Sequence, residues 1–151
     1  EVEGYLLSVD NIDWDILASA DVIVMGCPTY MGSASAPFKA FMDASSKAWS
    51  EQLWQGKLAA GFTNSGGLSG DKLAVLQQLQ LFAMQHGMLW VGMPLQPTGT
   101  SPEDLNRMGS YMGLMAQSDS APVDVTPPIG DLRTAEWFGQ HIAKTVQRII
   151  N

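Results

Sequence analysis

The run DVIVMG at residues 21–26 constrains the fold of this chain more than any other feature. It is continuously apolar and rich in β-branched side chains, which is typical of a parallel strand covered on both faces. A loop of small and polar residues, GCPTYMGSAS at residues 26–35, follows this run, and apolar residues at helical spacing come next. We therefore expect a buried strand that ends in a loop and leads into a helix.

The same order of strand, loop and helix continues along the chain. Strands are predicted at residues 4–9, 21–26, 57–63 and 88–93, and helices at residues 13–20, 38–49, 73–86 and 133–150. Residues 94–132 are predicted to be mostly irregular, apart from a short helix that SPED could cap. This alternation predicts an α/β domain in which helices sandwich a parallel sheet, with right-handed crossovers. A length of 151 residues indicates a single domain over residues 1–151.

Composition excludes several classes of function. The net charge is −7 with only 8 Lys and Arg residues, so no basic surface is available for nucleic acid or for an anionic membrane. No apolar run approaches the roughly 20 residues that span a bilayer. The single cysteine, Cys27, rules out an internal disulfide and fits a reducing, cytoplasmic location. His86 and His141 fall on different predicted helices, so no metal site is expected.

Three loops are predicted to meet at one edge of the sheet. They are GCPTYMGSAS, TNSGGLSGD at residues 63–71 and PLQPTGTSPED at residues 94–104. Ligands of open parallel sheets bind beyond the carboxyl ends of the strands. Glycine allows close backbone approach, and amides entering a helix favour an electron-rich oxygen. The sequence therefore predicts a site for a flat, oxygen-rich ligand, although glycines that only make turns would give the same pattern.

The glycine-rich loop does not have the spacing of a nucleotide-binding motif. Lys72 follows it, but the G-x-x-x-x-G-K-[ST] pattern is not met and Leu73 stands where a magnesium-binding hydroxyl belongs. The chain also lacks the G-x-G-x-x-G dinucleotide motif and the G-x-S-x-G motif of serine hydrolases. These motifs therefore give no support to an NTPase, a Rossmann dehydrogenase or a serine hydrolase.

The segment from GCPTYMGSAS to TNSGG resembles the core of the flavodoxin-like quinone oxidoreductases. This family includes the tryptophan-repressor-binding proteins and relatives of the NADPH-dependent FMN reductases. The shared pattern is G-x-P-T-[RY]-x-G, a helix with F-x-D, a Trp, G-K, a strand and a small-residue loop, followed by His86-Gly87-Met88. The resemblance covers about residues 4–100. It implies a flavodoxin-like three-layer sandwich with sheet order 2-1-3-4-5, and an FMN-dependent enzyme that passes two electrons from NADH or NADPH to a quinone-like acceptor.

The resemblance also assigns expected roles to individual residues. The residues expected to bind FMN are Pro28, Thr29, Tyr30, Met31 and Gly32 in the first loop, and Thr63, Asn64, Ser65, Gly66 and Gly67 in the second. Tyr30 and His86 are expected on the catalytic side, with His86 and Trp49 in the substrate pocket at a subunit contact of a homodimer or homotetramer. Tyr30 replaces the Arg of many relatives. On a purely structural interpretation, His86 is a helix-end residue and Trp49 is a packing or interface anchor.

The sequence departs from the family at its beginning. Its first predicted strand matches strand 2, so strand 1 and the phosphate-binding loop that follows it are absent from the sequence as given. We expect that the beginning is missing, rather than that the domain is incomplete, because a fold of this kind depends on its central strand. Two alternatives stay open: a flavodoxin-type FMN electron carrier and a flavin-free binding module.

Overall fold

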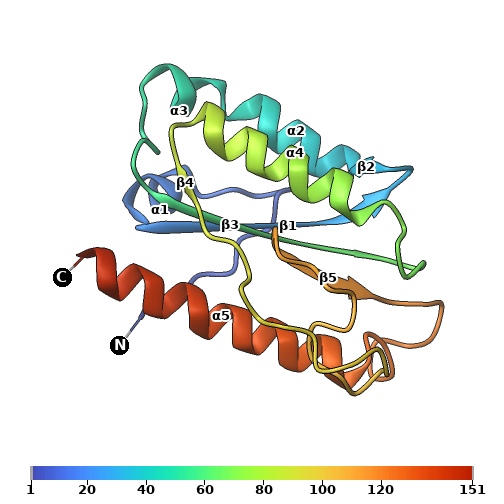
Figure 1. The fold of residues 1–151 in the computed structure, drawn as a ribbon. Coiled ribbons are helices and arrows are strands. Elements are labelled where there is room, and N and C mark those ends of the chain that lie inside the picture. The colour runs from blue at the N-terminus through green and yellow to red at the C-terminus, as the bar shows by residue number, and fades with distance from the viewer. Residues whose placement is uncertain (1, 151) are drawn as a thin grey trace.

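A computed structural model describes residues 2–150 as a sheet between two layers of helices. The helices are α1 (Trp14–Ser19), α2 (Ala36–Ala44), α3 (Ser46–Ser50), α4 (Lys72–Gln85) and α5 (Ile129–Ile150). The strands are β1 (Val22–Tyr30), β2 (Ser33–Ala34), β3 (Leu58–Ser65), β4 (Leu89–Trp90) and β5 (Leu114–Gln117). Figure 1 shows α2 and α4 over one face of the sheet and α5 over the other. The predicted three-layer α/β architecture is confirmed.

Strand β3 is central, and its neighbours on both sides run parallel to it. It pairs with β1 from Val22↔Leu58 to Pro28↔Asn64. On its other edge it pairs first with β4 and then, from Phe62 onwards, with β5. Strands β4 and β5 thus pair with successive parts of the same edge of β3, and residues 91–113 lie between them in the sequence. The carboxyl ends of β1, β3 and β5 consequently meet at one edge of the sheet.

Two hydrophobic clusters cover the two faces of the sheet. Under α2 and α4 the cluster includes Leu17, Ile23, Met25, Cys27, Phe38, Phe41, Trp54, Val75, Leu76 and Leu79. Under α5 it includes Leu58, Ala60, Val91, Met93, Leu114, Phe138, Ile142 and Val146. Burial raises the pKa of the Cys27 thiol, as expected for a small side chain in a core. Both clusters pack on one sheet, and the prediction of a single domain stays a prediction.

Local chemistry explains several boundaries of the helices. Asp13 caps α1, since its Oδ1 accepts hydrogen bonds from the backbone N–H groups of Asp15 and Ile16. Helix α4 stops before Gly87, which has a φ of +71° and so adopts the left-handed conformation that terminates helices. The single helix predicted at residues 38–49 is instead two helices, because the chain breaks at Ser45 between α2 and α3.

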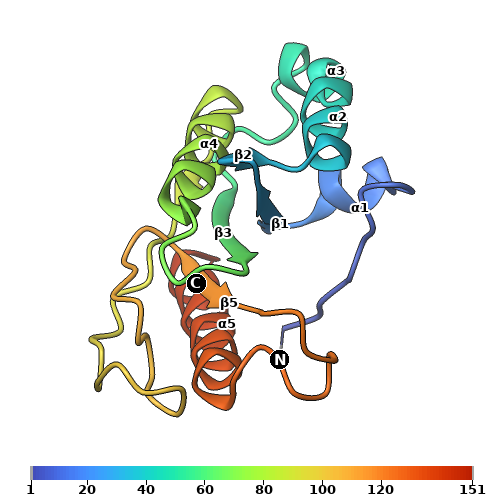
Figure 2. The same cartoon turned by 90° about the vertical axis from the view of Figure 1, so that its right-hand side faces the viewer.

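The strand predicted at residues 4–9 is wrong. These residues are irregular, and Figure 2 shows the segment before α1 running outside the sheet. A strand needs a neighbour to pair its backbone groups. Within residues 2–150 the segment pairs with no strand, and the outer edge of β1 carries only the short β2.

The region after α4 also differs from the prediction. The strand predicted at residues 88–93 is regular only over β4, and the stretch at 94–132 contains the unexpected strand β5 and the start of α5. Strand β5 is short and its sequence, LMAQ, gives no alternating pattern, so only its pairing with β3 identifies it. No helix in the part of the chain that the structure describes has the length and apolar character needed to cross a bilayer.

Candidate functional site

The end of β1 and the turn into β2 form a hairpin that exposes two bulky side chains; the predicted loop therefore begins later than expected, because β1 extends to Tyr30. Tyr30 is 72% exposed and Met31 is 93% exposed. Met31 has a φ of +50° and Gly32 a φ of +74°; a positive φ is strained for Met and is often found at functional sites. From α4, Gln78 Oε1 accepts hydrogen bonds from Ser33 Oγ at 3.1 Å and from the next backbone N–H at 3.2 Å. Helix α4 therefore fixes the hairpin while Tyr30 and Met31 face outward.

Two buried threonines join this hairpin to the loop after β3. Thr29 Oγ1 and Thr63 Oγ1 lie 2.8 Å apart at the carboxyl ends of the two strands. Next to them, Asn64 Nδ2 donates to Ser118 Oγ at 2.8 Å. Asn64 Oδ1 is buried and accepts no hydrogen bond from residues 2–150. A buried acceptor without a donor marks an incomplete hydrogen-bond set, which a ligand or a water can complete.

The glycine-rich loop is held from two sides. Lys72 is 0% exposed, and its Nζ donates to the carbonyl oxygens of Gly67 and, at 3.1 Å, of Leu68. Burial lowers the pKa of this ammonium group. From β5, Gln117 Nε2 donates to the carbonyl oxygen of Gly66 at 2.9 Å. These hydrogen bonds orient the backbone carbonyl groups of Gly66, Gly67 and Leu68 toward the side chains of Lys72 and Gln117.

A buried ion pair orients Gln117. Arg107 donates to both carboxylate oxygens of Asp131, at 2.7 and 3.0 Å, and the two side chains are only 5% and 2% exposed. Hydrogen bonding to Asp131 raises the pKa of Arg107. Arg107 also donates to Gln117 Oε1 at 3.0 Å, and Asp131 accepts from the Gln117 backbone N–H at 2.8 Å. Because the guanidinium occupies Oε1, the amide NH₂ of Gln117 faces Gly66.

Sequence reasoning missed these supporting residues. Lys72, Gln78, Arg107, Gln117 and Asp131 are ordinary polar residues, and most of their partners lie far away in the sequence. The one available signal was Lys72, which directly follows the glycine-rich loop. Its position suggested a phosphate-binding lysine, but its donors are used by loop carbonyl groups.

The predicted site residue His86 is buried at the other end of the sheet. Its imidazole is 2% exposed and packs on Trp54, with ring centroids 4.2 Å apart. Ser45 gives its hydroxyl proton to Met42 O, so it accepts from His86 Nε2–H at 2.9 Å. His86 Nδ1 is buried and, among the described residues, unpartnered. Burial lowers the pKa of His86 and favours the neutral imidazole.

A helix length separates His86 from the loops. His86 follows the last residue of α4, whereas Lys72 and the glycine-rich loop lie at its beginning. Fourteen helical residues span about 21 Å. Helix α3, which carries Trp49, also lies toward the end of the molecule away from the loops (Figure 1). Trp49 is half exposed. One chain therefore does not bring Trp49 or His86 to Tyr30, and their predicted roles stay predictions that require a second subunit.

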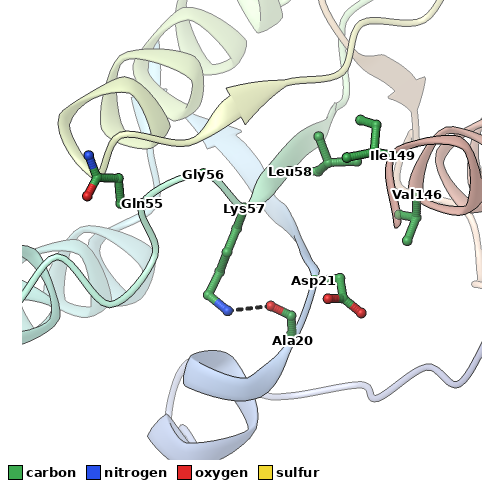
Figure 3. A pocket seen from close by; sticks show the side chains of 8 residues that line it. All are labelled: Ala20, Asp21, Gln55, Gly56, Lys57, Leu58, Val146 and Ile149. Carbon is green, nitrogen blue, oxygen red and sulfur yellow. Dashed lines mark hydrogen bonds between the residues drawn. The ribbon is translucent and has the colours of Figure 1, made fainter. Parts of the chain in front are cut away.

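A shallow pocket at the amino ends of β1 and β3 does not coincide with the predicted site. It has a volume of about 290 Å³ and is drawn in Figure 3. Lys57 crosses it and donates to the carbonyl oxygens of Ala18 and Ala20 at the end of α1. These bonds anchor the start of β3 to α1, and the lysine is therefore occupied in a structural contact.

A parallel sheet between helices, with a small-residue hairpin and a glycine-rich loop at its carboxyl edge, defines a flavodoxin-like protein. The family model described as NADPH-dependent FMN reductase matches residues 14–96, more than half of the chain. The chain therefore belongs to the NADPH-dependent FMN reductase family.

Comparison with individual proteins supports this membership. The chain is 40% identical to "Flavodoxin FldP" of Pseudomonas aeruginosa, across 94% of this chain and 79% of that protein. It is 32% identical to an NAD(P)H dehydrogenase (quinone) of Archaeoglobus fulgidus, across 88% of this chain and 63% of that protein. The crystal structure of a WrbA-like flavodoxin from Agrobacterium tumefaciens superposes with a TM-score of 0.70 at 43% identity, over 89% of this chain and 71% of that one. The chain thus spans less than two thirds of the quinone dehydrogenase.

Proposed function

We propose that this chain is part of an FMN-dependent oxidoreductase that passes two electrons from NADH or NADPH to a quinone-like acceptor. The observation that carries the proposal is the carboxyl edge of the sheet, where α4 fixes the hairpin after β1 and the loop after β3 together. Membership of the NADPH-dependent FMN reductase family supports it. So do the names of relatives, several of which are NAD(P)H dehydrogenases (quinone).

The residues at this edge fit an isoalloxazine ring. Such a ring is flat and apolar at one end and carries carbonyl oxygens and an N–H group at the other. Tyr30 and Met31 offer exposed apolar surface, and Asn64 Oδ1 is an acceptor without a donor within residues 2–150. The exposed loop from Gly66 to Ser69 offers backbone N–H groups. Both halves of the ring therefore find matching chemistry in one place.

We assign the chain's own groups the task of holding and shielding the cofactor. When bound, FMN supplies the two-electron chemistry, because it can be reduced by a nicotinamide and oxidised by a quinone. Pro28 to Gly32 form the wall beside the ring, with Tyr30 on its catalytic side. Thr63 to Gly67 form the second wall. Because His86 and Trp49 lie at the far end, a site that includes them needs a neighbouring copy, as in a homodimer or homotetramer in the cytoplasm.

Steady-state oxidation of NADH and NADPH with a quinone, in the presence of added FMN, tests this function. Removal of the side chain in Tyr30→Ala should lower kcat/KM for the quinone about tenfold, since part of the wall beside the ring is lost. Tyr5→Ala is the matched control, because Tyr5 is also exposed but precedes α1 and lies outside the sheet. If wild type and Tyr30→Ala were equally active, Tyr30 would have no role in the site. If wild type did not oxidise NADH or NADPH, the proposed enzymatic activity would be wrong.

A flavodoxin-type electron carrier is the second candidate. The 40% identical relative carries the name flavodoxin, and a net charge of −7 would steer the chain toward basic partners. A carrier would bind FMN but would oxidise neither NADH nor NADPH without a separate reductase. It would also be monomeric, so sedimentation of the flavin-loaded protein gives a second discriminating measurement.

A further inference from the structure

Lys72 is a charged side chain in an unusual position. Lysine is almost never fully buried unless it is paired, yet Lys72 is fully buried and forms no ion pair within residues 2–150. Its ammonium group donates instead to the carbonyl oxygens of Gly67 and Leu68. A methionine would fill a similar volume without the cost of burying a charge. The buried ammonium group of Lys72 is therefore energetically costly, and its described hydrogen bonds all go to the glycine-rich loop.

The bonds of Lys72 and Gln117 determine which way the loop peptides face. In a planar trans peptide the N–H group points opposite to the C=O group. Lys72 and Gln117 together hold the carbonyl groups of Gly66, Gly67 and Leu68, and Ser65 Oγ also donates to the Gly67 carbonyl oxygen at 3.2 Å. The N–H groups of residues 67–69 consequently point away from the two anchors. In the described chain none of them donates to a protein acceptor, and the residues are exposed.

A row of outward N–H groups binds oxygen atoms that carry negative charge. On the proposed function, which this inference presupposes, the oxygen-rich ligand at this edge is the flavin. We propose that Lys72 and Gln117 are positioning residues, which hold the loop so that its N–H groups donate to the carbonyl oxygens of the flavin ring. Neither side chain contacts the ring in this arrangement. They act by fixing the backbone, as Arg107 in turn fixes Gln117.

The first experiment needs no flavin. Lys72→Met removes the donors while keeping an unbranched side chain of similar length. Chymotrypsin should then cleave after Leu68 at least tenfold faster than in wild type, because loop opening no longer breaks two charge-assisted hydrogen bonds. Lys39→Met is the matched control, since Lys39 is exposed and pairs with Asp43 on α2. Equal cleavage rates in Lys72→Met and wild type would overturn the proposed anchoring.

The second experiment measures the dissociation constants of FMN and riboflavin by quenching of flavin fluorescence. Lys72→Met should weaken both ligands by the same factor, about tenfold, because the ring is common to them and the phosphate is not. Trp54→Ala is a destabilised control at the far end of the sheet, and it should keep both constants within about twofold. Weakening of FMN alone would overturn the assignment to the ring. A loss in Trp54→Ala equal to that in Lys72→Met would show a general effect of stability and overturn it too.

Gln117→Met keeps the inference testable if Lys72→Met does not fold. Gln117 is partly exposed, and its backbone bond to Asp131 stays in this variant. It should weaken FMN and riboflavin equally, about threefold, because the Gly66 carbonyl oxygen loses the neutral hydrogen bond from Nε2. The bond from Arg107 to Oε1 is lost as well, but it does not reach the loop directly. Unchanged affinity would contradict the role of Gln117. If wild type binds neither flavin, the proposed function fails together with this inference, whereas normal wild-type binding with an unchanged variant rejects the inference alone.

Discussion

The two ends of the sheet are stabilised in opposite ways. At the amino end, Trp54 lies among Trp14, Phe41, Phe82 and His86, so aromatic rings fill the space. At the carboxyl end, Lys72 and the Arg107–Asp131 pair are buried beneath exposed loops, and the partly exposed Gln117 lies beside them. Apolar packing is non-directional and tolerates volume-conserving exchange of side chains. Charged hydrogen bonds fix the direction of individual peptides, and this difference supports our proposal that the carboxyl end holds the ligand.

The largest expected effect comes from breaking the aromatic end. Trp54 is only 1% exposed, so Trp54→Ala should lower the free energy of unfolding by about 3 to 5 kcal/mol. Urea denaturation monitored by circular dichroism measures the change. Trp49→Ala, at a half-exposed position on α3, should cost less than about 1 kcal/mol. If the two substitutions lowered the free energy of unfolding equally, the aromatic cluster would not be the main source of stability at the amino end of the sheet.

Breaking the polar end should cost slightly less. Asp131→Asn leaves the guanidinium of Arg107 buried without its counter-charge, and we expect a loss of about 3 kcal/mol in urea denaturation. Adding Arg107→Met removes the stranded charge and should recover part of that loss. A double variant that is less stable than Asp131→Asn alone would mean that Arg107 stabilises the fold by contacts other than this pair.

A smaller effect is expected where the two loops join. Thr63→Val leaves the buried hydroxyl of Thr29 without its partner, which should lower the free energy of unfolding by about 1 to 2 kcal/mol. The double variant Thr29→Val and Thr63→Val removes both hydroxyl groups and should be closer to wild type than Thr63→Val. Strictly additive losses in thermal denaturation would contradict a direct bond between the two side chains.

The smallest effect concerns pH. Because burial lowers the pKa of His86 in the folded protein, the unfolded chain takes up a proton at this residue before the folded chain does. Stability from this residue is therefore complete above the unfolded-state pKa of about 6.5 and is lost as the pH falls below it. His86→Gln should flatten the decrease in unfolding free energy between pH 7.5 and 5.5. An unchanged decrease would mean that other groups cause it.

Much of the fold could be predicted from local patterns. The apolar runs identified β1 and β3, and buried residues at helical spacing, Val75, Leu76, Leu79 and Ala83, identified α4. Strand β5 could not be found this way, since its four residues owe their conformation to pairing with β3. Residues 4–9 failed for the converse reason, because within residues 2–150 their apolar pattern is not matched by pairing with any strand.

The candidate site was predictable in part. Small residues after β1 and β3 identified the two loops, and the structure brings Thr29 and Thr63 into direct contact. Sequence spacing could not show that Lys72 points back into its own loop, or that Gln117 arrives from a strand that was not expected. Nor could it show that α4 separates His86 from Tyr30. These features depend on three-dimensional partners and not on the spacing of residue types.

The visible absorption spectrum of the protein with added FMN tests the central claim most directly. The carboxyl edge should bind flavin, giving a spectrum distinct from that of free FMN. That spectrum should bleach with NADH or NADPH and return when a quinone is added. Absence of bound flavin at micromolar FMN would contradict the assignment of this edge as a flavin site, and bound flavin that neither nicotinamide reduces would leave the electron carrier as the function.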